Sequence, residues 1–482
     1  MDLLVSEVFR NAARNVGDRA ALHVNGQRWT FAQLDAASDR LATALLERGV
    51  RPGERILHSA ARSADTVMLF AAAARIGAVY APIDPSLSPD ERRPFEELVE
   101  PRLILEPADL AAVIAGLGDH PPEPVRDHQD ENAAHVLFFT SGSTGRAKGV
   151  PLTNRVSVLR SHAGAQPEPR GAAVCPFPLF HMASWTIALQ QWQARAAVVL
   201  PATLSAEAIF AAIEEHRAER IYCIPAIWRR LLDHHAGLRR SGGRLPDLSS
   251  LRMADTGTSR TPPELIQALI DLAPQARVRI FYGSTEAGLV ACLEGDALLE
   301  RPGRCGLPIQ GVEVRLSVTG ELEVRGPVVF PGYLGGADTE AFTPDGWLRT
   351  GDLAEIDDRG YLSITGRTKE IIRSGGHTIV PSEIEAVLAD MPGVADLAVA
   401  GRPDPDWGEI VCVALVLRDG AAAPDLAQLR AHCAGRLAPY KHPRQLVIVD
   451  HIPRTASTRQ VNRVALRGQL ATVLSAERST VR

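Results

Sequence analysis

Short apolar segments that are typical of buried strands alternate with helical segments over most of this 482-residue chain. This alternation predicts an α/β architecture with largely parallel sheets, because a helix must return the chain before the next parallel strand can start. The predicted strands lie at 134–139, 197–200, 220–224 and 277–282, and the predicted helices at 31–48, 205–216 and 262–272. A chain of this length is also too long for one compact core, so more than one domain is expected.

The pattern changes after about residue 306, where short strands and turns replace the alternation. The later strands are expected at 312–316, 320–324, 354–356, 361–365, 394–400 and 410–417, a hairpin turn at 357–360, and helices at 382–390 and 426–436. We therefore expect a large N-terminal domain over residues 1–368, made of two layered α/β subdomains and a β-rich subdomain at about 306–368. A small, mobile α+β domain would follow over residues 369–482.

Composition argues against several classes of protein. The net charge of -5 and the pI near 6.3 disfavour a nucleic-acid-binding surface, which needs a basic field. No apolar run reaches the ~18 residues that suit a membrane span, and the first residues lack the features of a secretory signal. The six cysteines are scattered without a C-x-x-C pair, which predicts neither a zinc site nor a disulfide framework. We expect a cytoplasmic protein.

A loop rich in Gly, Ser and Thr follows the apolar strand at 134–139. Its glycines permit positive φ, so successive backbone amides can form an anion-binding nest, and its hydroxyls and lysine add donors and charge. It is not a Walker A motif, because its lysine is followed by glycine rather than by Ser or Thr. A polyphosphate suits these groups better than the alternative, a flexible surface linker. The residues predicted to bind it are Thr140, Ser141, Gly142, Ser143, Thr144, Gly145 and Lys148.

The stretch 140–149 resembles the T-S-G-[ST]-T-G-x-x-K-G motif of the adenylate-forming superfamily, which includes acyl- and aryl-CoA synthetases, adenylation domains of peptide synthetases, and luciferases. Further motifs follow in the family's order, and the similarity runs from Trp29 to Arg467. The resemblance implies the two-domain fold expected above, with a hinge at Lys369. It also implies that ATP and Mg²⁺ are used and that an acyl-adenylate forms.

The hexapeptide Phe-Tyr-Gly-Ser-Thr-Glu that ends at Glu286 resembles the family motif Y-G-x-T-E. By this resemblance, Tyr282 stacks on adenine and Gly283 lets the backbone approach the substrate carbonyl. Thr285 donates to the α-phosphate, and Glu286 binds Mg²⁺, which prefers carboxylate and phosphate oxygens. Thr144 is expected to be a second Mg²⁺ ligand.

Two later motifs complete the predicted nucleotide site. The tripeptide Thr-Gly-Asp that ends at Asp352 matches the family's T-G-D, whose carboxylate accepts both ribose hydroxyls. The segment 366–370 matches G-R-x-[KD]-[DE], where Arg367 contacts ribose or phosphate. Lys369 belongs to this nucleotide set as well as to the hinge.

The pocket for the acid is predicted from segments that resemble the family's acyl-binding stretches. His181 is expected to gate the pocket or contact the acid, with a core histidine as the alternative. Asp255 is expected to contact a polar or cationic substrate group, with a solvated strand-end carboxylate as the alternative. The predicted pocket consists of His181, Trp185, Asp255, Thr256, Gly257 and Ser284.

One motif departs from the family. Relatives carry a lysine in a C-terminal P-R-T-x-[ST]-G-K segment, where it bridges the attacking carboxylate and the α-phosphate. Here Arg459 occupies that position without a gap, and Gln460 occupies it with a one-residue shift. Arg is planar and bulkier than Lys, and loss of such a donor costs roughly 3–4 kcal/mol in the transition state. The predicted catalytic residues are Thr285, Glu286, His181, Lys148 and Arg459.

The leading hypothesis is ATP-dependent adenylation of a small acyl or aryl acid, with release of pyrophosphate and transfer to CoA or to the thiol of an external carrier protein. One alternative keeps the fold but activates a different nucleophile, as an ATP-dependent diazotase activates nitrite for an aryl amine. The other is a non-catalytic nucleotide-binding protein, which the missing lysine favours and the intact motifs oppose.

Overall fold

The computed structural model describes residues 2–118, 130–141, 147–162, 171–257, 259, 261–336, 340–455 and 460–480. The chain forms two compact units. Unit 1 consists of Met1–Glu313 and Val324–Leu348, and unit 2 consists of Val314–Glu323 and Arg349–Arg482. Each has the mixed α/β composition that the alternating sequence pattern predicts.

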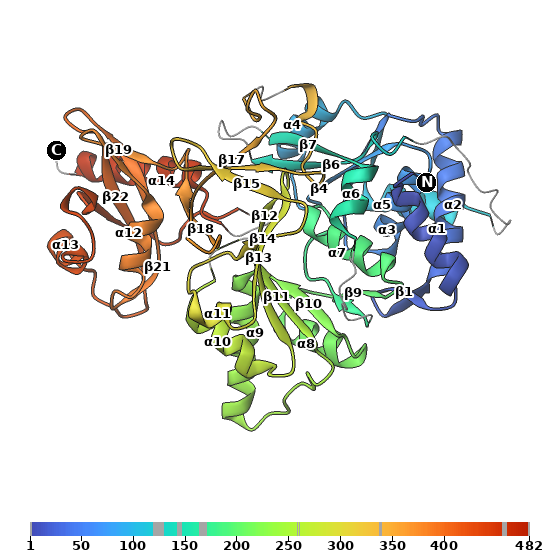
Figure 1. Ribbon diagram of the computed structural model, residues 1–482, viewed down its shortest axis with the longest axis horizontal. Helices are drawn as coiled ribbons and strands as arrows, with labels where there is room; N and C mark the ends of the chain where they lie inside the picture. Colours follow the sequence, from blue (N-terminus) through green and yellow to red (C-terminus); the bar gives the residue numbers. More distant parts are fainter. Residues whose placement is uncertain are drawn as a thin grey trace. The chain divides into compact units, whose positions relative to one another are not determined.

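A five-stranded sheet in unit 1 has the order β5-β3-β4-β6-β7, in which the first four strands are parallel and β7 is antiparallel. Its strands are β3 (Arg55–Ser59), β4 (Val79–Ile83), β5 (Leu103–Leu105), β6 (Ala134–Ser141) and β7 (Ala147–Thr153). Helices α1 (Val5–Val16), α2 (Phe31–Glu47) and α3 (Ala64–Arg75) pack against one another in this unit (Figure 1). The Thr30 hydroxyl accepts from the backbone of Gln33 and caps α2, as the sequence predicts.

A second sheet in unit 1 has nine strands in the order β14-β13-β12-β11-β10-β8-β9-β1-β2. The strands from β12 to β1 in this order are parallel, and β2, β13 and β14 are antiparallel additions. The strands are β1 (Ala20–Val24), β2 (Gln27–Thr30), β8 (Ala173–Val174), β9 (Val198–Leu200), β10 (Arg220–Cys223), β11 (Met253–Gly257), β12 (Arg277–Ser284), β13 (Gly288–Glu294) and β14 (Leu307–Pro308). Helices α8 (Ala206–Glu215), α9 (Pro225–Ser241) and α10 (Pro263–Leu272) lie beside it (Figure 1).

The predicted phosphate loop joins the two strands of a hairpin. Strand β6 continues to Ser141 and β7 begins at Ala147, so both ends of the predicted loop are strand. The register pairs Thr140 with Lys148. Two predicted phosphate contacts therefore face each other at the base of the loop.

A four-stranded sheet has the order β15-β16-β17-β18 and corresponds to the predicted β-rich region. Its strands are β15 (Glu313–Leu316), β16 (Glu321–Arg325), β17 (Leu348–Ile356) and β18 (Leu362–Arg367). The predicted hairpin turn joins β17 to β18, where the Gly360 amide donates to the Asp357 carbonyl over 2.9 Å and Gly360 has a φ of +85°.

The compact units do not follow the expected division after residue 368. Residues 349–368 cluster with the C-terminal residues, because β18 packs against α12 (Pro381–Leu388). The Ser382 hydroxyl fixes this packing by donating to the Thr365 carbonyl over 2.6 Å. The hinge at Lys369 stays a prediction.

The C-terminal sheet of unit 2 has hydrophobic side chains on both faces. Its order is β20 (His377–Ile379), β19 (Ile372–Ser374), β22 and β21, with β23 (Gln445–Ile448) parallel to β22. Alternate residues of β21 (Val394–Asp404) and β22 (Gly408–Leu417) belong to two separate core clusters, as the two-residue period of a strand requires. Helices α12 and α13 (Leu426–Cys433) cover one face, and α14 (Arg463–Thr480) covers the other (Figure 1).

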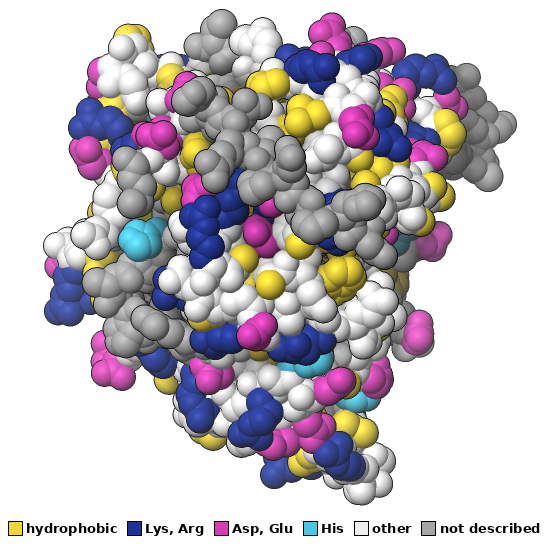
Figure 2. Space-filling model, turned by 90° about the vertical axis from the view of Figure 1, so that its right-hand side faces the viewer, with side chains coloured by type: hydrophobic (Ala, Val, Ile, Leu, Met, Phe, Trp, Pro, Cys, Tyr) yellow, Lys and Arg dark blue, Asp and Glu magenta, His cyan; other side chains and the backbone are white. Residues whose placement is uncertain are grey.

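Among the residues that the structure describes, no helix is both long and apolar enough to cross a membrane. On the face drawn in Figure 2, Lys and Arg side chains lie among Asp and Glu side chains instead of forming one continuous field.

Candidate active site

Glu286 lies in the turn between β12 and β13, where two hydroxyl groups meet its carboxylate. Thr140, near the end of β6, donates to Glu286 Oε1 over 3.2 Å. Tyr333 donates to the same oxygen over 2.9 Å. These bonds hold the carboxylate beside the base of the predicted phosphate loop. They thereby join two motifs that the sequence analysis assigned to phosphate and Mg²⁺.

Lys148 extends this cluster. It is the cross-strand partner of Thr140, and its ammonium lies 4.7 Å from the centroid of the Tyr333 ring. A cation over an aromatic face is attracted by the electron density of the ring, which limits where the ammonium can lie. Thr140, Lys148 and Glu286 therefore come together, and Thr285 directly precedes Glu286 in the chain. The structure describes Ser141 only as the end of β6, and Gly142, Ser143, Thr144 and Gly145 lie outside the described residues.

The described residues contain no group of three or more His, Cys, Asp or Glu side chains that could hold a metal ion. A single carboxylate such as that of Glu286 suits Mg²⁺ only when phosphate oxygens and water supply the other ligands. The cluster could therefore bind the metal together with a nucleotide.

Gly283 and Ser284 shape the turn that carries Glu286. A Cβ on Gly283 would lie 2.2 Å from the Gly288 carbonyl oxygen, so the hairpin itself requires glycine there. The Ser284 hydroxyl accepts from the Ala287 amide over 3.0 Å. In this structure Ser284 stabilises the turn, while Tyr282, two residues earlier, is partly exposed. Its stacking on adenine stays a prediction.

His181 caps helix α7 (Met182–Gln193), and its Nδ1 accepts from the Ala183 amide over 3.2 Å. This bond places the ring proton on Nε2. Burial lowers the pKa of His181 to about 4, so the ring is neutral at pH 7. The ring also stacks on Phe177, with 5.8 Å between centroids. A neutral Nε2–H donor can serve either in a pocket or in a core.

An aromatic wall connects His181 to Gly257. Phe177 contacts Tyr222 edge-on, and the ring centroids of Tyr222 and Phe281 are 5.8 Å apart. A Cβ on Gly257 would lie 2.8 Å from the Tyr222 hydroxyl and 2.3 Å from the Phe281 carbonyl oxygen. The backbone at Gly257 therefore approaches the wall as closely as only glycine allows.

Asp255 does not line a pocket, which corrects both expectations for it. It is fully buried in the middle of β11, and it pairs with Arg220 and Arg279 from the two neighbouring strands, with closest N···O distances of 2.8 Å. Arg279 is its direct cross-strand partner. Burial alone would raise the pKa of Asp255, but the two guanidinium groups hold it below the ordinary value. The carboxylate is an internal counterion.

Thr256 points to the opposite face of the sheet from Asp255 and Gly257, because successive strand residues alternate. It is fully buried, and its hydroxyl has no hydrogen-bond partner among the described residues. The predicted pocket residues of β11 therefore cannot all face one ligand.

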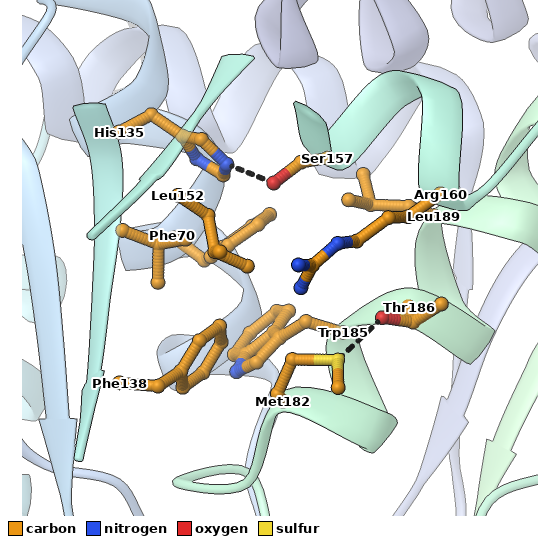
Figure 3. A pocket seen from close by; sticks show the side chains of 11 residues that line it. Phe70, His135, Phe138, Leu152, Ser157, Arg160, Met182, Trp185, Thr186 and Leu189 are labelled. Atoms are coloured by element: carbon orange, nitrogen blue, oxygen red, sulfur yellow. Dashed lines mark hydrogen bonds between the residues drawn. The ribbon is translucent and has the colours of Figure 1, made fainter. Parts of the chain in front are cut away.

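Trp185 is a core side chain and not an open pocket wall. It is 2% exposed, stacks on Phe70 with 3.9 Å between centroids, and donates its indole N–H to the Leu179 carbonyl. It borders a small cavity of about 10 Å³ (Figure 3). A cavity of this size holds about one water molecule. An acid substrate would not fit there.

Two predicted nucleotide contacts meet in unit 2. Asp352 on β17 and Arg367 on β18 are cross-strand partners, and Arg367 Nε lies 3.0 Å from an Asp352 carboxylate oxygen. The Thr350 hydroxyl supports this arrangement, since it accepts from the Asp352 amide and donates to the Leu322 carbonyl. Lys369 follows two residues later and is exposed.

The C-terminal segment that departs from the family motif is described only at its two ends. Arg454 and Val461 form a β-bridge, and the Thr455 amide donates to the Gln460 carbonyl over 2.8 Å. The backbone of Gln460 therefore closes the segment. Arg459 lies outside the described residues, and its role stays a prediction.

Sequence reasoning missed Tyr333. The residue lies 47 positions from Glu286, and no motif marks it, since a single tyrosine after Pro-Gly is typical of a turn.

A family model described as AMP-binding enzyme matches residues 8–334, and a second, described as AMP-binding enzyme C-terminal domain, matches residues 383–459. The chain belongs to the AMP-binding enzyme family. The first match covers the predicted phosphate loop, the aromatic wall and Glu286, and the second covers most of the C-terminal sheet. This confirms the resemblance to adenylate-forming enzymes.

Similar proteins carry related names. The chain is 33% identical to an indoleacetate–CoA ligase of Aromatoleum aromaticum over 93% of this chain and 94% of the relative. It is 31% identical to a feruloyl-CoA synthase of an Amycolatopsis species over 92% and 95%. The o-succinylbenzoate CoA synthetase of Bacillus subtilis, solved with its acyl-adenylate intermediate, superposes with a TM-score of 0.83 at 26% identity, over 95% of this chain and 97% of that chain. This AMP-binding enzyme is thus an AMP-forming acid–thiol ligase.

Proposed function

We propose that this AMP-binding enzyme uses ATP and Mg²⁺ to activate an aryl or cyclic acid that carries no charge besides its reacting carboxylate, and that it transfers the acyl group to CoA. One observation carries the nucleotide part of the proposal, namely the hydrogen bond between Thr140 and Glu286. It joins the base of a phosphate-binding loop to a carboxylate suited to Mg²⁺. The relatives named above as CoA ligases and synthases support CoA as the acceptor.

The proposed reaction has two steps. A carboxylate oxygen of the acid attacks the α-phosphorus of ATP, the bond to the bridging oxygen of the pyrophosphate breaks, and pyrophosphate leaves. The CoA thiol, after losing its proton, then attacks the acyl carbon, and AMP leaves with the electron pair of the broken C–O bond. Both reactants of the first step are negatively charged, so the site must offset charge before they can meet.

Residues of both motifs would supply part of this charge compensation; Lys148, Thr285 and Glu286 are among the described residues, and Thr144 is not. Lys148 would contact the phosphates beside the amides of the loop, and Mg²⁺, bound by Glu286 and Thr144, would offset charge on the phosphate oxygens. Thr285 would donate to the α-phosphate. In unit 2, Asp352 would accept from the ribose hydroxyls, and Arg367, which bonds Asp352, would hold that carboxylate in place.

The aromatic character of the wall supports the proposed class of acid. Phe177, Tyr222 and Phe281 contact one another in this wall, and the neighbouring His181 is neutral at pH 7. Asp255, the acidic residue predicted for this pocket, already forms ion pairs with Arg220 and Arg279 inside the sheet. Arg279, whose guanidinium lies 5.0 Å from the centroid of the Phe281 ring, is already paired with Asp255, so a second charge on the acid would compete with that ion pair at this wall.

The C-terminal residues would act in both steps. Arg459 would replace the family lysine between the carboxylate and the α-phosphate, and Lys369 would serve as the hinge between the two half-reactions. The diazotase and non-catalytic alternatives gain no support from the relatives, which are named as CoA ligases and synthases.

The test is to incubate the purified protein with ATP, Mg²⁺ and single acids, with and without CoA, and to measure AMP and pyrophosphate. Aryl-acetic and aryl-propenoic acids should yield AMP and, with CoA, a thioester, whereas oxalate and malonate should yield little. AMP formation from dicarboxylates alone would refute the proposed class of acid. A parallel reaction with nitrite and an aryl amine tests the diazotase alternative. Absence of AMP in every reaction would refute the proposal that the protein catalyses adenylation.

A further inference from the structure

Arg160 is a partly buried cation, and each of its three guanidinium nitrogens donates to a backbone carbonyl near or bonded to the segments around Glu286. It is the last residue of helix α6 (Asn154–Arg160). Its Nε donates to the Val328 carbonyl, its Nη1 to the Thr285 carbonyl and its Nη2 to the Glu286 carbonyl, each over 2.8 Å. Burial lowers the pKa of Arg160 to about 9, opposed by the Glu286 carboxylate, so the guanidinium stays charged at pH 7.

We propose that Arg160 is a positioning residue that fixes the backbone of Thr285 and Glu286 so that their side chains face the phosphates and the metal. The proposal rests on the function proposed above, because it takes these two side chains to contact ATP and Mg²⁺. Arg160 itself touches neither.

The bonds of Arg160 hold two segments that meet at the Glu286 carboxylate. Thr285 and Glu286 belong to the turn between β12 and β13, and Val328 leads to Tyr333, whose hydroxyl donates to that carboxylate. The Phe330 amide also donates to the Glu286 carbonyl over 2.9 Å. Loss of Arg160 would therefore release both the turn that carries the carboxylate and the segment that orients it.

The Arg160 side chain lies among mainly apolar side chains and directly beside Gly288. Figure 3 shows the guanidinium extending from α6 toward Trp185 and Met182, among mainly apolar side chains. Hydrogen bonds to a charged donor are strong where water is excluded. A Cβ on Gly288, which has a φ of +74°, would lie 2.8 Å from Arg160 Nε. The turn therefore packs directly against the guanidinium, and a side chain at position 288 would collide with it.

Lysine cannot replace this fork. A guanidinium presents five N–H donors in a plane, whereas an ammonium is a compact point charge on a flexible stem. Arg160→Lys would keep the charge but would not reach three carbonyls in different directions. This variant therefore separates the geometric role from the electrostatic one.

The kinetic test compares Arg160→Lys with Arg155→Lys. Arg155 is on the same helix, but it bonds Glu131 at the surface over 2.7 Å. Arg160→Lys should lower kcat about 100-fold, the effect of a displacement of roughly 1 Å remote from the chemistry. It should also raise the Mg²⁺ concentration needed for half-maximal AMP formation, with little change in KM for the acid. Arg155→Lys should match the wild type in all three.

Hydrogen exchange tests the same inference without activity. In Arg160→Lys, peptides covering 285–288 and 328–330 should exchange faster than in the wild type, while peptides of β3 and β4 stay unchanged. Unaltered exchange in these peptides would overturn the proposal, as would wild-type kcat and Mg²⁺ dependence in the folded variant. If Arg160→Lys exchanges faster but the wild-type protein itself forms no AMP, Arg160 still positions the turn, and the link between this turn and ATP is refuted.

Discussion

The hydroxyl of Thr140 donates a hydrogen bond of 3.2 Å to the carboxylate of Glu286, although the two residues lie 146 positions apart in the chain. Tyr333 donates to the same oxygen, and Lys148 lies over the Tyr333 ring. Four residues from three segments of unit 1 therefore form one cluster, and substitutions at Glu286 and Tyr333 should alter its function.

Glu286→Gln keeps the size of the side chain and removes its charge. We expect kcat to fall by about 100-fold, as for loss of one preorganised electrostatic contact, and the Mg²⁺ requirement to rise. ATP binding, measured by calorimetry in the absence of an acid, should change little. An unaltered Mg²⁺ dependence in steady-state AMP formation would show that Glu286 is not the metal ligand.

Tyr333→Phe removes one hydrogen bond to Glu286 and keeps the ring under Lys148. We expect kcat/KM to fall roughly tenfold, which corresponds to about 1.4 kcal/mol for a bond to a charged group. Tyr333→Leu also removes the ring, so its loss should be larger. Equal losses in the two variants would exclude a contribution from the contact between Lys148 and the ring.

Asp255→Asn leaves two buried guanidinium groups without their counterion. We expect the free energy of unfolding to fall by about 3 kcal/mol, as for other broken buried ion pairs, measured by urea denaturation. Because the pKa of Asp255 is lowered in the folded state, its contribution is present at neutral pH and disappears as pH falls through that lowered pKa. The difference from the wild type should therefore shrink in acid. Asp233→Asn, at an exposed position on α9, is the control.

His181 should not set the pH profile of activity near neutrality. Its folded pKa of about 4 lies below the ordinary value of 6.5, so the ring is neutral above about pH 5. His181→Asn retains an acceptor for the Ala183 amide. The profiles of kcat/KM between pH 5.5 and 8 should have the same shape in both proteins. An inflection near pH 6.5 that disappears in the variant would contradict this assignment.

The local elements were largely predictable, because propensity, capping and periodicity act over a few residues. Helix α2 begins at the predicted Thr30 cap, and the hairpin between β17 and β18 turns at the predicted Gly360. The phosphate loop was predicted less well. Both of its ends continue as strand, because Thr140 and Lys148 pair across β6 and β7. Such pairing depends on register, which a run of Gly, Ser and Thr does not encode.

Sequence motifs named most residues of the candidate site, whereas residues whose contacts depend on packing carry no motif. Asp255 looked like a pocket residue, but Arg279 on the adjacent strand pairs with it inside the sheet. Arg160 and Tyr333 carry no motif, since their roles arise from carbonyls and a carboxylate more than 40 residues away. A side chain that acts through distant backbone leaves no local pattern.

The sequence by itself determined the class of fold and the family, because strand and helix periodicity and short motifs are local properties of the chain, while the roles of the loop near Thr140 and of Glu286 stay predictions. Only the tertiary structure decided which charges are internal and which serve the site. It paired Asp255 with arginines inside the sheet, left Glu286 bonded to two hydroxyls, and placed Arg160 against the turn. The physical reason is that ion pairing and burial depend on which strands become neighbours, and in this chain those neighbours come from distant segments.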